Sequence, residues 1–199
     1  MDLQLPDHPF QGYIFDCDGT IADTMPLHYR AWQRAMDELG GQFPEDLLYS
    51  WGGTPTRKII SQLNERFGTT MDPHEAATLK EKYYVELIPE ALPIEPVIDL
   101  VRQFHGHAPM AVASGGFREL VIGTLDALEI RHYFDAIICA EDTERGKPHP
   151  DPFLAAAEAL GVPPENCLVF EDAPMGIEAA KAAGMRYVLV PSAPSEKNP

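Results

Sequence analysis

The spacing of hydrophobic residues divides the chain into stretches of different secondary structure. Near the N-terminus a short apolar run, Tyr13-Ile14-Phe15, ends abruptly at the polar string Asp16-Cys17-Asp18-Gly19-Thr20. This predicts a buried strand that leads into a loop. Over residues 26–39 apolar side chains recur every three or four positions until Gly40-Gly41 ends the pattern, as in an amphipathic helix. Helical spacing continues without a convincing strand, so we expect an all-helical block over about 24–92.

After residue 93 strands and helices alternate. Four short apolar runs predict strands at 109–113, 136–140, 167–170 and 187–190. Three stretches have clear helical spacing, around 119–128, 153–160 and 176–183. The first strand has no partner near it in the sequence and must join the same parallel sheet. We therefore predict an α/β fold: a doubly wound, Rossmann-like core of residues 1–22 and 93–199 with an inserted helical cap domain at 23–92.

Composition excludes several classes of protein. The formal net charge of −16, without a concentrated basic patch, would repel nucleic acid and an anionic membrane. Three widely spaced cysteines without a CxxC pair indicate neither a disulfide framework nor a zinc site. No apolar run approaches the roughly 20 residues of a membrane span, and the N-terminus lacks the order of a secretory signal. We expect a cytoplasmic monomer with reduced thiols.

Four of the predicted strands lead to polar residues at the edge of the sheet where ligands bind in such folds. In chain order they are Asp16 with Asp18, Ser114 with Gly115, Lys147 in a loop, and Glu171 with Asp172. Crowded carboxylates need a cation, because like charges raise one another's pKa values. Oxygen ligands favour magnesium or calcium over zinc. The lysine and the donors around the serine suit a transferring phosphoryl group, and an aspartate can attack phosphorus.

These residues resemble the motifs of a known family. The string Asp16-Cys17-Asp18-Gly19-Thr20 resembles the DxDG[TV] signature of the haloacid dehalogenase superfamily. Ser114, Lys147 and the pair Glu171-Asp172 are similar to its second, third and fourth motifs, and they occur in the family's order. The segment Arg30-Ala31-Trp32 and the residues after Asp172 resemble the β-phosphoglucomutase-like branch, whose helical cap follows the first motif.

The resemblance implies a role for each matching residue. Asp16 would be the nucleophile that forms an aspartyl phosphate, with Asp18 as general acid and then base. Mg²⁺ would be held by Asp16, the backbone carbonyl of Asp18 and Asp172, with Glu171 nearby. Ser114 and Lys147 would bind the phosphoryl oxygens. The implied substrate contacts also include Thr24, His28, Trp32, Gly53, Lys80 and Gly115.

Two departures from the mutase pattern favour hydrolysis. Thr56 stands where the mutase has an arginine for the distal phosphate, with Arg57 one position later, and Thr20 replaces a common valine. We therefore expect a magnesium-dependent phosphatase of small phosphorylated metabolites, such as sugar phosphates. The alternatives are a β-phosphoglucomutase and a non-catalytic binding module on the same fold.

Simpler structural explanations compete with some of these assignments. Asp-Gly is a frequent turn pair, and an acidic pair before a helix often caps it. His28 could equally pack in the cap or contact substrate, and Trp51 could be core or cap lining. The His105 and His107 pair lacks nearby acids, so we expect solvated surface. Cys17 alternates away from the two aspartates and should be packed.

Overall fold

The computed structural model describes residues 3–51, 54 and 56–191. It divides into two compact units. Residues Thr24–Ala91 form one unit, which we call the cap, and the segments before and after it form the other, which we call the core. In the part of the chain that the structure describes, no helix is both long and apolar enough to span a bilayer.

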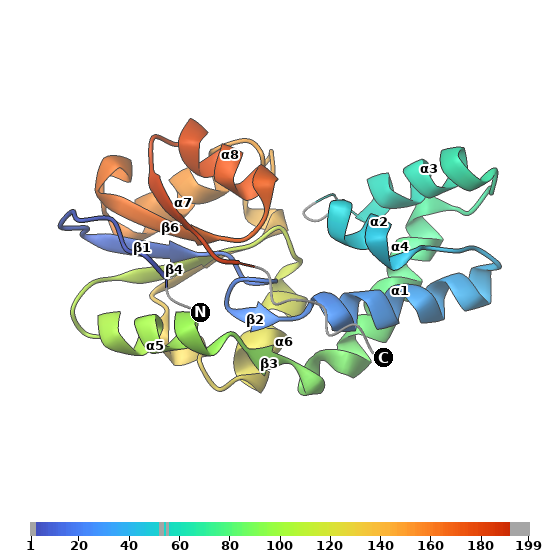
Figure 1. The fold of residues 1–199 in the computed structure, drawn as a ribbon, viewed down its shortest axis with the longest axis horizontal. Coiled ribbons are helices and arrows are strands. Elements are labelled where there is room, and N and C mark those ends of the chain that lie inside the picture. Colours follow the sequence, from blue (N-terminus) through green and yellow to red (C-terminus); the bar gives the residue numbers. More distant parts are fainter. Residues whose placement is uncertain (1–2, 52–53, 55, 192–199) are drawn as a thin grey trace. The chain divides into compact units, whose positions relative to one another are not determined.

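A five-stranded parallel sheet lies at the centre of the core, with β1 in the middle (Figure 1). Its order is β5 (Ala136–Ile138), β4 (Met110–Ala113), β1 (Gly12–Phe15), β6 (Cys167–Glu171) and β7 (Arg186–Leu189). The central strands are buried on both faces, which explains their continuous apolar runs. The prediction that the first strand joins the later ones is confirmed.

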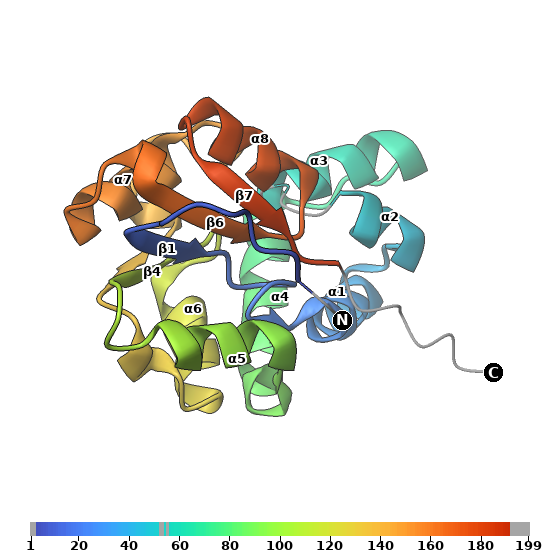
Figure 2. The same cartoon turned by 60° about the vertical axis from the view of Figure 1, so that its left-hand side comes forward.

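Helices cover both faces of this sheet. The two on one face are α5 (Glu95–Phe104) and α6 (Arg118–Ala127), and the two on the other are α7 (Asp151–Leu160) and α8 (Pro174–Ala182) (Figure 2). Short 3-10 turns complete the core: η2 (Arg131–Tyr133), η3 (Ala140–Asp142) and η4 (Pro164–Asn166). Two apolar layers, one on each side of the sheet, thus stabilise the doubly wound fold.

The core contains elements that the sequence did not predict. Helix α5 was absent from the expected helices, although its buried residues Val97, Ile98, Val101 and Phe104 have helical spacing. The strand expected at 136–140 ends at Ile138, because the chain turns into η3. An antiparallel pair of two-residue strands, β2 (Ala22–Asp23) and β3 (Leu92–Pro93), lies beside the two junctions with the cap. The expected all-helical block therefore ends before Leu92.

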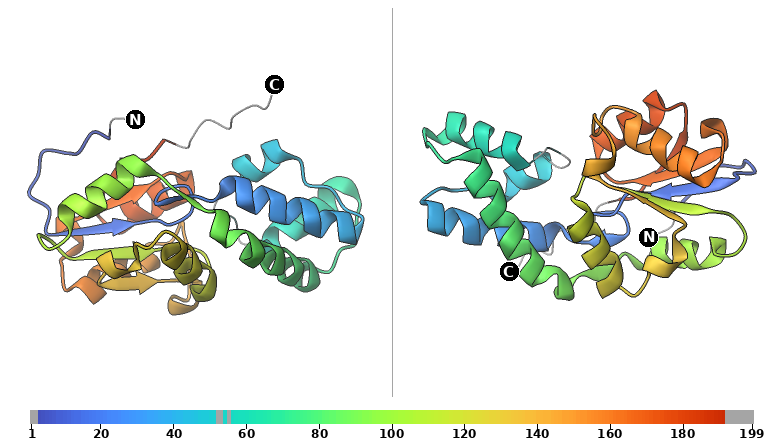
Figure 3. Two further views of the ribbon diagram at one scale, coloured as in Figure 1. Left: turned by 90° about the horizontal axis from the view of Figure 1, so that it is seen from below. Right: turned by 180° about the vertical axis from the view of Figure 1, so that it is seen from behind.

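The cap consists of α1 (Met25–Leu39), α2 (Glu45–Ser50), α3 (Thr56–Phe67), α4 (Pro73–Leu87) and the 3-10 turn η1 (Ile88–Glu90). Helix α1 ends where Gly40 adopts a left-handed conformation, with φ 65°, as the Gly-Gly pair predicted. Helices α1 and α4 lie side by side (Figure 3). The cap thus has an apolar core of its own, in which Trp32, Ile60 and Leu63 are buried.

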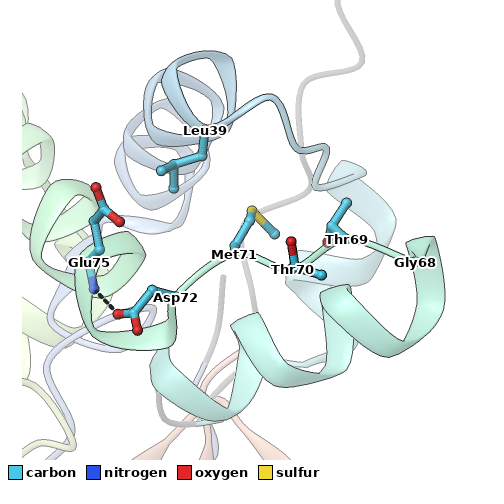
Figure 4. A pocket seen from close by; sticks show the side chains of 7 residues that line it. All are labelled: Leu39, Gly68, Thr69, Thr70, Met71, Asp72 and Glu75. Carbon is cyan, nitrogen blue, oxygen red and sulfur yellow. Dashed lines mark hydrogen bonds between the residues drawn. The ribbon is translucent and has the colours of Figure 1, made fainter.

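A hollow of about 490 Å³ lies on the cap between the end of α1 and the loop before α4 (Figure 4). Its lining includes Thr69, Met71 and Asp72. One carboxylate oxygen of Asp72 accepts hydrogen bonds from the backbone N–H groups of His74 and Glu75. That carboxylate therefore caps the start of α4.

Candidate active site

Three carboxylates gather at the carboxyl edge of the sheet. Strands β1 and β6 pair in register, with Phe15 beside Phe170, so the next residues, Asp16 and Glu171, are neighbours. The backbone N–H of Asp16 donates to the carbonyl of Phe170 at 3.0 Å. One oxygen from each of Asp16, Glu171 and Asp172 lies within 4.8 Å of the others. The convergence of these acids follows directly from the strand register.

Lys147 bridges two of the acids. Its Nζ donates to Asp16 Oδ1 at 2.7 Å and to Glu171 Oε2 at 2.8 Å, and its side chain is only 9% exposed. Burial alone would lower the pKa of this lysine, but the carboxylates of Asp16 and Glu171 raise it above its ordinary value. Lys147 is therefore a fixed cation and not a solvated loop charge.

One ammonium does not neutralise three carboxylates. Burial, and then the charge of Glu171, raises the pKa of Asp16 well above its ordinary value despite the opposing charge of Lys147. Burial and Glu171 likewise raise the pKa of Asp172 to about 7. When all three acids are ionised, two negative charges remain in excess at the edge of the sheet. The cluster therefore favours a partner that carries positive charge.

The donor set fits a hard divalent cation. The three side chains offer only carboxylate oxygens, and two of them are buried. Oxygen ligands suit magnesium or calcium, whereas zinc and softer metals prefer nitrogen and sulfur. A charge of +2 also matches the excess at this cluster. The residues present can thus hold a hard divalent cation such as Mg²⁺.

A second group of polar residues follows β1 and β4. Ser114 is nearly buried, and its Oγ accepts a hydrogen bond from the backbone N–H of Gly116 at 3.1 Å. A Cβ placed on Gly116 would lie 3.4 Å from Ser114 Oγ and 3.8 Å from Asp18 Oδ2. Both side chains therefore approach the same glycine. Gly115 is exposed, and a Cβ there would meet nothing within 4 Å.

Sequence reasoning missed two residues that contact Asp172. The hydroxyl of Thr20, which is fully buried, donates to Asp172 Oδ1 at 3.2 Å. Gly19 has φ +81°, and a Cβ there would lie 2.3 Å from Asp172 Oδ2. Only glycine fits this position, because both the backbone conformation and the carboxylate exclude a side chain. The only sequence signal was their place in the DxDG[TV] string.

The cap brings two of the predicted substrate contacts together. His28 stacks on Tyr84 with ring centroids 4.1 Å apart, and its Nδ1 lies 2.9 Å from Lys80 Nζ. Lys80 is 5% exposed, and its ammonium also lies over the Tyr84 ring. Since an ammonium can only donate, Nδ1 of His28 is the acceptor in this pair. His28 thus combines packing with a polar contact.

The other cap residues are placed differently. Thr24 is fully buried at the start of α1. Trp32 is 2% exposed and meets Phe43 edge to face, with centroids 5.1 Å apart. Trp51 is half-buried and also packs near Phe43. Gly53 lies outside the described residues. The side chain of Trp32 therefore contributes mainly to the apolar core of the cap.

Two expectations about side chains outside the cluster are confirmed. His105 and His107 are exposed, and His105 contacts the ring of Tyr133. Within residues 3–51, 54 and 56–191, no histidine takes part in a group of three potential metal ligands. Cys17 is fully buried, as its alternation away from the two aspartates predicted.

Comparison with known proteins identifies the family of the chain. The model of the haloacid dehalogenase-like hydrolases matches residues 10–184. The chain belongs to this family. Among haloacid dehalogenase-like relatives, the chain is 39% identical over 181 residues to the fructose-1-phosphate phosphatase YqaB of Escherichia coli, covering 91% of this chain and 96% of the relative. It is 30% identical over 182 residues to a phosphorylated carbohydrates phosphatase of Thermotoga maritima, covering 89% and 83%.

A solved structure supports the same assignment. The crystal structure of β-phosphoglucomutase from Clostridium difficile superposes with a TM-score of 0.76 at 31% identity, and covers 89% of this chain and 83% of that one. The haloacid dehalogenase-like fold predicted from the motifs is thus confirmed, and the chain is an enzyme of this hydrolase family.

Proposed function

We propose that this enzyme is a magnesium-dependent phosphatase of phosphorylated sugars that uses Asp16 as its nucleophile. The observation that carries the proposal is the position of Asp16. This carboxylate is buried, bound to Lys147 at 2.7 Å and grouped with Glu171 and Asp172. Such an environment combines a nucleophile with positive charge for a phosphoryl group.

The chain's own residues account for both steps of hydrolysis. In the first, the Asp16 carboxylate attacks phosphorus while the bond to the ester oxygen breaks, and Asp18 gives that oxygen its proton. In the second, Asp18 takes a proton from water, which attacks the aspartyl phosphate and releases inorganic phosphate. Lys147 and Ser114 bind the phosphoryl oxygens. Asp16, Asp172 and the backbone carbonyl of Asp18, with Glu171 nearby, would hold magnesium, which when bound would supply positive charge to the transferring group.

The sugar-phosphate substrate class is supported by the relatives. Those from Escherichia coli and Thermotoga maritima are described as phosphatases of fructose 1-phosphate and of phosphorylated carbohydrates. In our proposal the cap chooses the substrate through Thr24, His28, Lys80 and Gly53, and Gly115 contributes from the core. The edge-to-face contact of Trp32 with Phe43 in the apolar core of the cap supports a packing role for that residue. Thr56 in place of an arginine favours hydrolysis over a bisphosphate mutase cycle.

A substrate screen with a matched variant tests the proposal. Wild-type protein and Asp16→Asn are assayed for phosphate release from a panel of sugar phosphates with magnesium, after circular dichroism shows both folded. We expect turnover by the wild type and none above trace level by the variant, because an amide cannot replace the attacking carboxylate. Appreciable activity of the pure variant would refute the nucleophile. Isomerised sugar phosphate without free phosphate would establish the mutase instead.

We further propose that the enzyme acts as a monomer in the cytoplasm on a small-molecule phosphate ester. All three cysteines are free and buried, which suits a reducing compartment. The charge of −16 opposes binding to nucleic acid. Light scattering of the purified protein tests the monomer, since a dimer would double the measured mass.

A further inference from the structure

The first turn of α8 packs directly against the carboxylate of Glu171. A Cβ on Gly176 would lie 2.1 Å from Glu171 Cδ and 2.4 Å from each carboxylate oxygen. These distances are far below van der Waals contact, so the carboxylate occupies the space of a side chain at position 176. Any residue other than glycine there has to displace Glu171.

Glu171 cannot move without breaking its other contacts. It is 1% exposed, its Oε2 accepts from Lys147 Nζ at 2.8 Å, and its Oε1 accepts from the backbone N–H of Ala173 at 3.0 Å. Lys147 in turn contacts Asp16. A displacement of Glu171 would therefore disturb Asp16 through one side chain, that of Lys147, and would leave the buried Lys147 ammonium poorly paired.

The helix itself gives no reason for glycine at this position. Gly176 lies inside α8, and its backbone does not adopt the left-handed conformation that favours glycine. Alanine is the better helix former, by up to about 1 kcal/mol, so helix propensity does not favour glycine in this first turn. The space taken by Glu171 is thus the physical reason for the missing Cβ.

We propose that Gly176 is a positioning residue for phosphoryl transfer. By lacking a Cβ it lets Glu171 lie against α8 and hold the Lys147 ammonium at Asp16. Gly176 contacts none of the reacting atoms and acts through Glu171 alone. This inference rests on the proposed phosphatase function, but the contact itself can be tested without turnover.

The first test compares two glycine-to-alanine substitutions. Gly176→Ala should lower kcat/KM by about 10- to 100-fold, the range seen when residues that orient an active-site ligand are replaced. Gly146→Ala is the matched control, because a Cβ at this glycine would meet nothing within 4 Å. It should change kcat/KM less than about twofold. Equal effects of the two substitutions would overturn the proposal.

The second test uses rescue by a shorter carboxylate. Glu171→Asp withdraws the carboxyl carbon by about one C–C bond, roughly 1.5 Å, which makes room for a methyl group at position 176. In the Glu171→Asp background, Gly176→Ala should therefore lower kcat/KM and the urea midpoint much less than it does in the wild-type background. The same fold loss in both backgrounds would mean that Gly176 serves α8 in general, and would contradict the proposal.

The urea measurement remains informative in two further cases. If the wild type turns over no phosphate ester, the proposed function fails, yet the coupling in urea still shows whether residues 176 and 171 compete for space. If Gly176→Ala does not fold, recovery of folding by the added Glu171→Asp supports the proposal. A double variant that also fails to fold overturns it.

Discussion

The acidic cluster predicts that the metal-free enzyme loses stability as pH rises. Burial and the charge of Glu171 raise the pKa of Asp172 from 3.8 to about 7. Between these values the folded protein keeps a proton that the unfolded chain has lost. Unfolding then releases protons, so the free energy of unfolding falls as pH increases through this window. Burial also raises the pKa of Asp16, which acts in the same direction.

The size of the effect follows from the two pKa values of Asp172. A difference of one pKa unit corresponds to about 1.36 kcal/mol between the protonation states. With the folded pKa at about 7, linkage gives a loss of about 2 to 3 kcal/mol from Asp172 between pH 5 and pH 8. Above pH 8 the carboxyl is ionised in both states, so its contribution no longer changes.

Urea unfolding in chelator over this pH range measures the loss. The control is Asp172→Asn, which cannot ionise but keeps an oxygen that can accept from Thr20. The difference between wild type and control should follow the expected fall, and magnesium should stabilise the wild type most at pH 8, where the carboxylates are ionised. A wild-type curve parallel to that of the control would refute the electrostatic account of the cluster.

Three more predictions concern catalysis and metal binding. Asp18→Asn should lower the turnover of sugar phosphates by about 100-fold or more, but it should slow the first step much less with a nitrophenyl ester, so that labelled phosphate accumulates on Asp16. Equal modest losses on both esters, without accumulation of label, would exclude acid–base catalysis by Asp18. Chelator should abolish wild-type turnover, magnesium should restore it and calcium should not, because its larger coordination sphere spoils in-line geometry; unchanged rates in chelator would refute the metal requirement. Thr20→Val should weaken magnesium binding by about 10-fold, because Asp172 loses the hydrogen bond from the Thr20 hydroxyl. Equal magnesium affinities of the wild type and the variant in a metal titration would show that this hydroxyl does not position the Asp172 carboxylate.

The sequence predicted the acidic edge of the sheet because local and global signals agree there. The apolar run before Asp16 and the run before Glu171 each end in acids, and parallel strands bring such ends together. The pairing of Phe15 with Phe170 makes this explicit. Long periodic stretches such as α1 could also be predicted from the sequence, because apolar spacing over fifteen residues clearly indicates a helix.

Other features depend on contacts that no local pattern encodes. The strands β2 and β3 have two residues each, too few for any alternation, and exist through their pairing. Gly176 in a helix is locally unfavourable, and only the position of Glu171 explains it. Thr20 was visible as a departure from mutases, but its bond to Asp172 joins residues 152 positions apart. Helix α5 is a different case, because its apolar spacing was present in the sequence.

The pairing of β2 with β3 also has an evolutionary consequence. The chain leaves the core after Asp23 and returns at Leu92, and these two residues are direct partners across the strand pair. Because the two ends of the insertion are direct neighbours, a longer or shorter insert leaves the distance between Asp23 and Leu92 unchanged and alters the entropy of loop closure only slowly. Selection can therefore exchange or remodel the inserted module while the strands that carry the acids stay unchanged. Since the cap chooses the substrate in our proposal, new substrates could be acquired while the residues that carry out phosphoryl transfer stay the same.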